Sequence, residues 1–241
     1  MSDMIFLDTV DSTNTYLKER RDFLPDGATV TARLQTAGRG RLGRAWSADD
    51  GMLPLSVLLK NPENPSTVSL CAGVAVCEAL ENAFPTITAE IKWPNDIIVS
   101  CRKVCGILCE SVCVGEKIDV ICGIGVNLTQ TADFFAERGL PHGASLKMLT
   151  GEETDRNTLA EDIADRLKAL CRCGFLQIYE QYRKRCLTLG KHVRLINSGS
   201  ERTAFAEDIA ENGFLVCIDE NGQRFFVNSG EVSVRGLMDY V

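Results

Sequence analysis

The C-terminal segment, residues 191–241, restricts the possible folds more than any other part of the chain. After Leu189-Gly190 the apolar residues occur in short runs, and turn dipeptides such as Asn212-Gly213 and Asn221-Gly222 separate these runs. Asparagine and glycine both tolerate the positive φ angles of tight hairpin turns, so these dipeptides predict antiparallel hairpins. We expect a small β-barrel whose strands cover residues 193–197, 202–209, 214–218 and 224–227.

Residues 1–190 show a different pattern, in which strands and helices are mixed. Apolar residues three or four positions apart predict helices over 66–84 and 158–185, and Ser12 or Thr13 can cap a helix that reaches about residue 23. Short apolar runs predict strands over 5–10, 29–33, 52–59, 91–93, 97–100, 104–112 and 119–127. The chain therefore predicts an α+β fold: a mixed β-sheet flanked by helices in residues 1–190, followed by the small β-barrel domain in residues 191–241.

The overall charge and the terminal sequence exclude several classes of protein. The net charge is −7, whereas nucleic-acid binders carry a basic excess that contacts phosphate, so we expect no nucleic-acid partner. No apolar run approaches the roughly 20 residues that span a bilayer. The N-terminus also lacks the basic and apolar regions of a signal peptide. These features predict a cytoplasmic protein without a membrane partner, in which thiols stay reduced.

The thiol and imidazole side chains do not indicate a metal centre or a nucleophile. His142 and His192 are the two histidines of the chain, and neither has the sequence context of a catalytic triad. The 11 cysteines do not show the paired CxxC spacing of a zinc site. We interpret the recurrent ones as buried small apolar residues: Cys101, Cys105, Cys109, Cys113, Cys171 and Cys173.

The most distinctive motif is the segment Gly38–Trp46, whose sequence is GRGRLGRAW. Its glycines allow the backbone to approach a ligand closely and to move when no ligand is bound. Its arginines supply permanently charged guanidinium groups, which fork onto phosphate or carboxylate oxygens. The segment is not a nucleotide-binding P-loop, because GxxxxGK[ST] is absent. We interpret it as a mobile cationic loop that closes on an anion and is open or disordered without one.

Three further segments carry polar residues or glycines in positions where a ligand could contact them. Lys92–Asp96, with sequence KWPND, predicts a turn fixed by proline, although its tryptophan could equally belong to the core. Lys103 begins an apolar strand and, taken alone, would be interpreted as a solvated lysine. Gly123–Asn127, with sequence GIGVN, predicts a strand that a ligand or another backbone approaches closely.

In this order and at these separations, the segments resemble the catalytic domain of biotin protein ligases. Asp11–Asn14, Gly143–Leu146 and Gly230–Arg235 fit the same family, so the resemblance covers essentially the whole chain. It implies a mixed sheet flanked by helices and a C-terminal barrel of the Src-homology-three type. Many bacterial relatives also carry an N-terminal DNA-binding repressor domain. Because this chain begins at the first strand of the catalytic domain, we expect a form that lacks the repressor domain.

The resemblance also implies a reaction. Biotin would attack the α-phosphate of ATP, with Mg²⁺ as activator, to give biotinyl-5'-AMP and pyrophosphate. A lysine of the biotin carboxyl carrier domain of acetyl-CoA carboxylase or a related carboxylase would then take the biotinyl group and release AMP. Such a path requires positioned positive charge rather than a protein nucleophile.

The resemblance further implies roles for individual residues. The catalytic residues would be Arg41, Lys103 and Asp96. Biotin would contact Ser12, Thr13, Asn14, Gln35, Gly38, Arg39, Arg41, Lys103 and Gly106. ATP and the adenylate would contact Arg39, Gly40, Arg41, Trp46, Asn95, Lys103, Asn127 and Arg235. No dedicated protein cage is expected for Mg²⁺, because this ion keeps several of its waters and binds mainly to phosphate oxygens.

Two alternatives remain open at this point. A lipoate or octanoate ligase would use the same scaffold, although the KWPND and arginine motifs favour biotin. A non-catalytic biotin-binding adaptor would use the barrel for contacts with other proteins. The oligomeric state is also open, since relatives include both monomers and homodimers.

Overall fold

The computed structural model describes residues 4–43, 46, 49–197, 200–229 and 233–236. Its larger part is a seven-stranded sheet with the strand order β1-β2-β3-β7-β6-β5-β4, in which β1 and β2 are parallel and the other neighbours antiparallel. This arrangement confirms the predicted mixed sheet. The strands are β1 (Met4–Val10), β2 (Thr29–Gln35), β3 (Met52–Leu59), β4 (Ala89–Lys92), β5 (Asp96–Val99), β6 (Arg102–Val114) and β7 (Lys117–Asn127).

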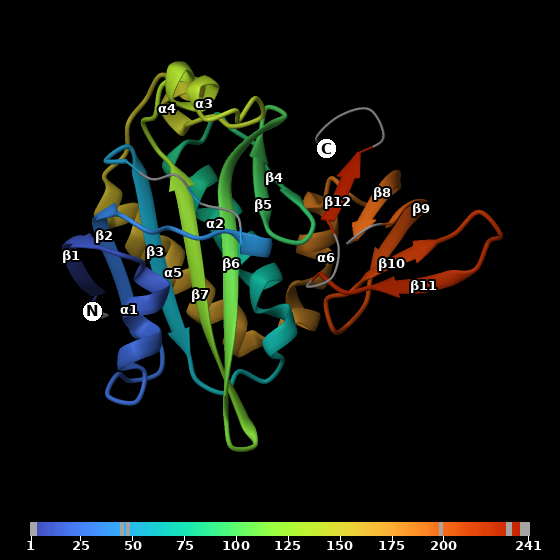
Figure 1. Cartoon of the computed structure of the whole chain (residues 1–241), viewed down its shortest axis with the longest axis horizontal. Helices are drawn as coiled ribbons and strands as arrows, with labels where there is room; N and C mark the ends of the chain where they lie inside the picture. The colour runs from blue at the N-terminus through green and yellow to red at the C-terminus, as the bar shows by residue number, and fades with distance from the viewer. Residues whose placement is uncertain (1–3, 44–45, 47–48, 198–199, 230–232, 237–241) are drawn as a thin grey trace.

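The two faces of this sheet have different partners. Because strand residues point alternately to opposite faces, Cys105 and Ile107 of β6 and Cys122 and Ile124 of β7 share one face. That face packs against α2 (Val68–Ala83) and α5 (Arg156–Cys173), which lie behind the sheet in Figure 1. The residues between them on each strand point to the other face, which is left for α1 and for a cavity.

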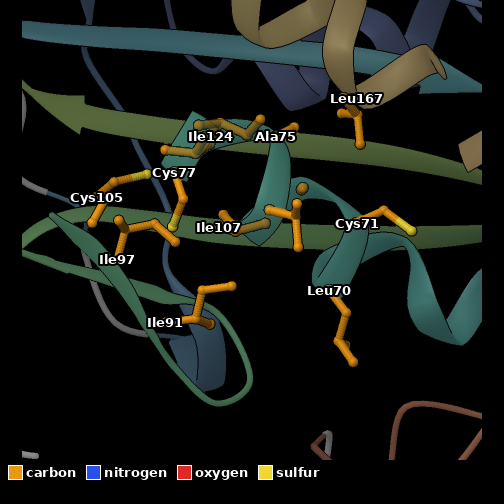
Figure 2. Close-up of a cluster of buried hydrophobic side chains, with 14 of the residues drawn as sticks. Leu70, Cys71, Ala75, Cys77, Ile91, Ile97, Cys105, Ile107, Ile124 and Leu167 are labelled. Carbon is orange, nitrogen blue, oxygen red and sulfur yellow. The ribbon is translucent and has the colours of Figure 1, made fainter. Parts of the chain in front are cut away.

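Helix α2 forms the centre of the main hydrophobic core. Eleven of its 16 residues are buried, and its charged and amide residues Glu78, Glu81 and Asn82 lie in its second half. A short 3-10 helix, η2 (Pro65–Thr67), leads into it and supplies the proline that cannot lie within a helix. Figure 2 shows side chains of α2 packed against those of β6, β7 and α5, among them Leu70, Cys71, Ala75, Ile107, Ile124 and Leu167.

Helix α1 (Thr13–Arg20) covers part of the opposite face (Figure 1). It begins at Ser12, whose side-chain hydroxyl accepts a hydrogen bond from the backbone of Thr15 at 3.4 Å. Its fully buried Leu17 packs with Val30, Leu58 and Ile121 in a small second core. The cap therefore fixes where the helix starts, next to the cavity described below.

The C-terminal residues form a separate five-stranded antiparallel sheet in the order β11-β10-β9-β8-β12, here called the C-terminal sheet (residues 191–236). Its strands are β8 (Lys191–Asn197), β9 (Ser200–Ile209), β10 (Leu215–Ile218), β11 (Arg224–Val227) and β12 (Ser233–Gly236). The four predicted hairpin strands are confirmed, and β12 was not predicted. The domain boundary between residues 190 and 191 stays a prediction.

The helices differ from the predictions in three places. The helix predicted over 158–185 is two helices, α5 and α6 (Phe175–Arg185), because Gly174 between them has a φ of +81° that breaks the helix. Helix α1 ends at Arg20 rather than near residue 23. The short helices α3 (Ala132–Glu137) and α4 (Leu146–Thr150) were not predicted. No helix in the described part of the chain is both long enough and apolar enough to span a membrane.

The prediction that the recurrent cysteines are buried is wrong for half of them. Cys105 is buried beneath α2, whereas Cys101, Cys113 and Cys173 are exposed. Cys101 lies in the turn before β6 with a φ of +61°, and Cys113 lies near the end of the β6–β7 hairpin. Residues four apart on a strand share a face, but only the central part of that face lies under the helices.

Candidate active site

Glycines of β6 and β7 form the floor of a cavity of about 360 Å³. Gly106 and Gly125 lie directly opposite each other in the antiparallel register. The indole of Trp46 rests on them, because a methyl group built on Gly106 would lie 2.8 Å from a ring carbon of that indole. On Gly125 the methyl would lie 2.5 Å from the indole nitrogen. Glycine at both positions is thus what allows a flat ring to lie against the sheet.

A chain of hydrogen bonds forms one wall of the site. The Gln35 side-chain oxygen accepts from the backbone N–H of Thr13 at 2.8 Å and from its hydroxyl at 3.0 Å. The fully buried Ser56 hydroxyl lies 2.8 Å from the Thr13 hydroxyl and 2.6 Å from the Asn14 side-chain oxygen. The Asn14 amide then donates to Glu110 at 2.7 Å. These residues come from α1, β2, β3 and β6, so the fold brings together polar groups far apart in the sequence.

Cationic side chains converge on the same cavity. Lys103 Nζ lies 2.5 Å from Asp96 Oδ1, and the two side chains are only 22% and 14% exposed. Arg41 donates to the side-chain oxygen of Asn95 at 2.9 Å and also to the backbone carbonyl of Ser229 beside the C-terminal sheet. The site therefore concentrates positive charge, with one carboxylate beside it.

The turn Lys92–Asp96 holds these groups through its buried residues. Trp93 is 1% exposed, and its indole nitrogen donates to the carbonyl of Gly213 in the C-terminal sheet at 3.2 Å. The peptide bond that joins it to Pro94 is cis. Asn95 donates from its amide to the carbonyl of Ile107 on β6 at 2.9 Å. Trp93 is thus a core residue that anchors the turn, and all five residues of Lys92–Asp96 contribute to the lining of the cavity.

The far end of the cavity is apolar and lies next to α3. Phe134 and Phe135 are packed edge to face, with their ring centroids 5.3 Å apart. The chain after α3 then runs beside β6, where the backbone N–H of Lys103 donates to the carbonyl of His142 at 2.7 Å. Sequence analysis missed this end of the site, which is lined by Phe134, Phe135, Gly139, Leu140, Pro141, His142 and Gly143.

The described part of the Gly38–Trp46 loop lies over the cavity and crosses in front of β7 and β6 (Figure 1). Residues 44, 45, 47 and 48 lie outside the described part. Arg39 donates to the Thr15 hydroxyl at 3.0 Å and lies 3.6 Å from Glu110. The backbone N–H of Trp46 donates to the carbonyl of Gly38 at 3.0 Å. The expectation that the loop is open or disordered without a ligand stays a prediction.

Most of the residues predicted for the site line this one cavity. Gly38 does not, although its carbonyl holds Trp46, and the side chain of Arg235 lies outside the described part of the chain. The backbone of Arg235 pairs with Arg194 in the C-terminal sheet. The predicted residues that line the cavity are Ser12, Thr13, Asn14, Gln35, Arg39, Gly40, Arg41, Trp46, Asn95, Asp96, Lys103, Gly106 and Asn127.

Sequence analysis missed Ser56 and Glu110, which complete the hydrogen-bonded wall. A single serine or glutamate inside an apolar strand gives no signal of its own. Their positions on the cavity side of β3 and β6 follow only from the alternation of those strands once the sheet order is known. Among the described residues, no three histidine, cysteine, aspartate or glutamate side chains lie close enough together to hold a metal ion.

Two protein-family models and several known proteins match the sequence of this chain. The model of the biotin/lipoate A/B protein ligase family matches residues 6–127, and that of the biotin protein ligase C-terminal domain matches residues 188–235. The biotin–[acetyl-CoA-carboxylase] ligase of Mycobacterium tuberculosis is 35% identical over 86% of this chain and 79% of its own length. The ligase of the same name from Paracoccus denitrificans is 33% identical over 86% of this chain and 90% of its own.

A solved structure supports the same assignment. Biotin protein ligase from Aquifex aeolicus in complex with biotin and ATP superposes with a TM-score of 0.82, at 32% identity. The superposition covers 98% of this chain and 100% of that one. With the family model matched over half of the chain, this chain belongs to the biotin/lipoate A/B protein ligase family.

Proposed function

We propose that this chain is an ATP-dependent biotin–[biotin carboxyl carrier protein] ligase. It activates biotin as biotinyl-5'-AMP and transfers the biotinyl group to a lysine of the carrier domain of acetyl-CoA carboxylase or a related carboxylase. The observation that carries the proposal is one cavity with a hydrogen-bonding wall, a glycine floor and a cationic centre at Lys103 and Arg41. These three parts match the ureido group of biotin, its fused rings and its carboxylate.

Biotin binding is assigned to the wall and the floor. The urea group of biotin has one carbonyl acceptor and two N–H donors, which match hydroxyl and amide side chains such as those of Ser12, Thr13 and Gln35. Asn14 shapes the same wall, and Gly106 leaves room for the fused rings above β6. Trp46 lies where these rings would go, so it would have to move aside and pack against the ligand instead.

Adenylation is assigned to the cationic centre. The biotin carboxylate oxygen attacks the α-phosphorus of ATP, the bond to the β-phosphate oxygen breaks, and pyrophosphate leaves. Negative charge builds on the phosphoryl oxygens, and preorganised cations stabilise it. Lys103 lies beside Asp96 at this centre. Arg39 and Arg41 would exchange their present partners for carboxylate and phosphate oxygens. Gly38 and Gly40 would allow the loop to close.

Transfer is assigned to the same centre. The carrier lysine attacks the carbonyl carbon of the mixed anhydride as a neutral amine, and AMP leaves. Asp96, paired with Lys103, is the carboxylate at this cationic centre, so it would position the incoming amine or accept its proton. A proton acceptor within hydrogen-bond reach of the amine is what this step requires.

The nucleotide is assigned to the apolar end of the cavity. Phe134, Phe135 and Pro141 offer apolar surface for a flat base, and Asn95 and Asn127 offer polar groups nearer the phosphates. Arg235 would reach the phosphates from the C-terminal sheet. Mg²⁺ would bind to the ATP phosphates and keep several of its waters, because this ion gives up its hydration shell reluctantly.

The proposal also covers the cellular location, the partners and the oligomeric state. A net charge of −7 disfavours contact with nucleic acid. The proposal places the reaction in the cytoplasm, without a membrane partner. All the residues to which we assign a role belong to one chain, so either a monomer or a homodimer could carry out the reaction.

The decisive experiment measures the mass of a carrier domain after incubation with the full chain, MgATP and biotin. We expect one biotinyl group per carrier domain, located on a lysine, and none when ATP is left out. Lipoate and octanoate in place of biotin test the other activity of the family. If lipoate or octanoate modified the carrier and biotin did not, the chain would be a lipoate or octanoate ligase. If no acid modified it, the remaining interpretation would be a non-catalytic biotin-binding adaptor.

A further inference from the structure

A second cavity, of about 380 Å³, lies on the side of the molecule away from the active site. It is bounded by the start of α2, the junction of α5 and α6, and Glu211 of the loop after β9. Three thiols line it, those of Cys71, Cys171 and Cys173. None of the residues assigned to biotin or ATP lines this cavity, so the proposed ligase reaction gives its thiols no role.

The antiparallel packing of α2 and α5 brings two of these thiols together. Two contacts fix the register of the helices: Arg166 with Glu78 at 3.1 Å, and Asn82 with Asp162 at 3.3 Å. Each step of four residues toward the start of α2 matches a step of four toward the end of α5, so the first turn of α2 faces the last turn of α5. Cys71 and Cys171 lie in those turns and both line the cavity, and their thiols are close enough to interact electrostatically.

Helices α2 and α5 pack against each other, and small residues are among those that both helices bury. Helix α2 buries Ala72, Ala75 and Ala79, and α5 buries Ala160 and Ala164. Small side chains bring the helix axes together, and a disulfide needs two Cα atoms no more than about 6.8 Å apart.

The other neighbouring thiols fit less well. Cys173 is two residues from Cys171, and positions two apart on a helix do not face each other. Cys173 is also exposed, and the thiol that interacts with Cys71 is that of Cys171. Cys109 and Cys122 are directly opposite on β6 and β7, but neither lines the cavity, and Cys122 is fully buried. A reagent entering the cavity therefore meets Cys71 and Cys171 as its one facing pair among the described residues.

We propose that Cys71 and Cys171 form a reversible oxidation site, in which a peroxide that enters the cavity converts the two thiols to a disulfide between α2 and α5. Cys171, the less buried of the two, attacks one peroxide oxygen, the O–O bond breaks, and water and a sulfenic acid result. The Cys71 sulfur then attacks the Cys171 sulfur, an S–S bond replaces the S–O bond, and a second water leaves.

The order of attack agrees with the protonation of the pair. The hydrogen bond with Cys171, together with burial, raises the pKa of the Cys71 thiol. Cys71 therefore keeps its proton in the reduced pair, and Cys171 is the sulfur open to the first attack. Once formed, the disulfide closes a loop of about 100 residues, which in the chain-entropy model stabilises the folded state.

The test exposes the reduced full-length chain to hydrogen peroxide, blocks the remaining thiols with iodoacetamide and maps the peptides by mass. We expect a disulfide that joins the Cys71 and Cys171 peptides, reversed by dithiothreitol. Its formation should raise Tm by roughly 10 °C. Cys71→Ser should leave Cys171 as a sulfenic acid that dimedone traps, and Cys171→Ser should leave Cys71 unmodified and Tm unchanged by peroxide.

Cys101→Ser, in an exposed turn, is the matched control and should keep the cross-link and the rise in Tm. A disulfide between Cys171 and Cys173, or between Cys109 and Cys122, would overturn the assignment. So would oxidation of the exposed thiols while Cys71 and Cys171 stay reduced. Thermal melts of both serine variants before oxidation show that they are folded, and the outcome does not depend on ligase activity.

Discussion

Lys103 and Asp96 together set the charge of the active site. Each is largely shielded from water, where an unpaired charge would be costly, and their 2.5 Å contact pairs the two charges. A carboxylate and a triphosphate bring several negative charges to the same lysine. Lys103 can then turn to the ligand while Asp96 becomes available to the incoming amine, which gives one ion pair a part in both proposed steps.

The first prediction concerns this lysine. Lys103→Ala should lower the rate of adenylate formation about 10²–10³-fold, because one preorganised positive charge is lost where negative charge develops. Arg41→Ala should act in the same direction. Biotin-dependent release of pyrophosphate measures the step, and Lys117→Ala, on the exposed start of β7, is the control. Pyrophosphate release near the wild-type rate in both variants would refute the assigned roles.

The second prediction concerns Ser56. Ser56→Ala leaves the Asn14 side-chain oxygen without its 2.6 Å partner in a buried network, and such a loss costs about 1–3 kcal/mol. If the wall binds biotin, the KM for biotin should rise about tenfold or more while kcat changes less. Ser111→Ala, an exposed position on β6, provides the comparison. An unchanged KM would show that the network does not shape the biotin site.

At the scale of elements, hydrophobic patterns predicted the strands well and the short helices poorly. Strands β3 and β7 contain long apolar runs, so their existence was clear, but burial on both faces of these runs hid which residues face the cavity. Helices α3 and α4 are each about one turn or two and depend on capping by Thr131 and Ser145. Elements so short carry no period that sequence alone can reveal.

The same limit applies to the site. Motifs with an unusual composition, such as Gly38–Trp46 and Lys92–Asp96, identified residues that do line the cavity. Ser56, Glu110 and Phe134 belong to no motif and become visible only when the sheet order places them near the others. The contacts that the motif residues make, such as the pair between Lys103 and Asp96, could not be predicted without the fold either.

The third prediction concerns the contact between α2 and α6. Arg185 forks onto Glu81 at 2.7 and 2.8 Å, and this hydrogen bonding lowers the pKa of Glu81 below its ordinary value of 4.5. A carboxylate with a lowered folded-state pKa stabilises the fold above pH 4.5 and loses this effect as the pH falls through the folded pKa. Glu81→Gln should therefore lower Tm by roughly 2–4 °C at pH 7 and by less at pH 3.5.

Thermal melts at the two pH values measure this difference. Glu220→Gln, in an exposed turn of the C-terminal sheet, removes a carboxylate in the same way and should leave Tm unchanged at both pH values. A Glu81→Gln deficit that stays constant between pH 7 and pH 3.5 would mean that the ionised carboxylate is not what stabilises this contact.

At the scale of the whole molecule, the active site joins the two sheets. Trp93 anchors the Lys92–Asp96 turn to Gly213, and Arg41 contacts the carbonyl of Ser229, so the C-terminal sheet supports groups on both sides of the cavity. A second set of contacts lies farther out, where α6 meets β9. The Tyr179 hydroxyl donates to Asp208 at 2.7 Å, and Arg183 lies 3.0 Å from the same carboxylate.

The last prediction tests whether these contacts make one cooperative unit. Asp208→Ala removes the shared acceptor of Tyr179 and Arg183, which should cost about 1–2 kcal/mol and lower Tm by roughly 2–8 °C in a single calorimetric transition. Glu207→Ala, its neighbour on β9, breaks only the exposed pair with Arg224 inside the C-terminal sheet and should change Tm little. Equal shifts in the two variants would show that the α6–β9 contact does not couple the sheets. Two separate transitions in the wild type would mean that the cavity is built from parts that unfold independently, and Arg41 would then lose its Ser229 contact before the seven-stranded sheet melts.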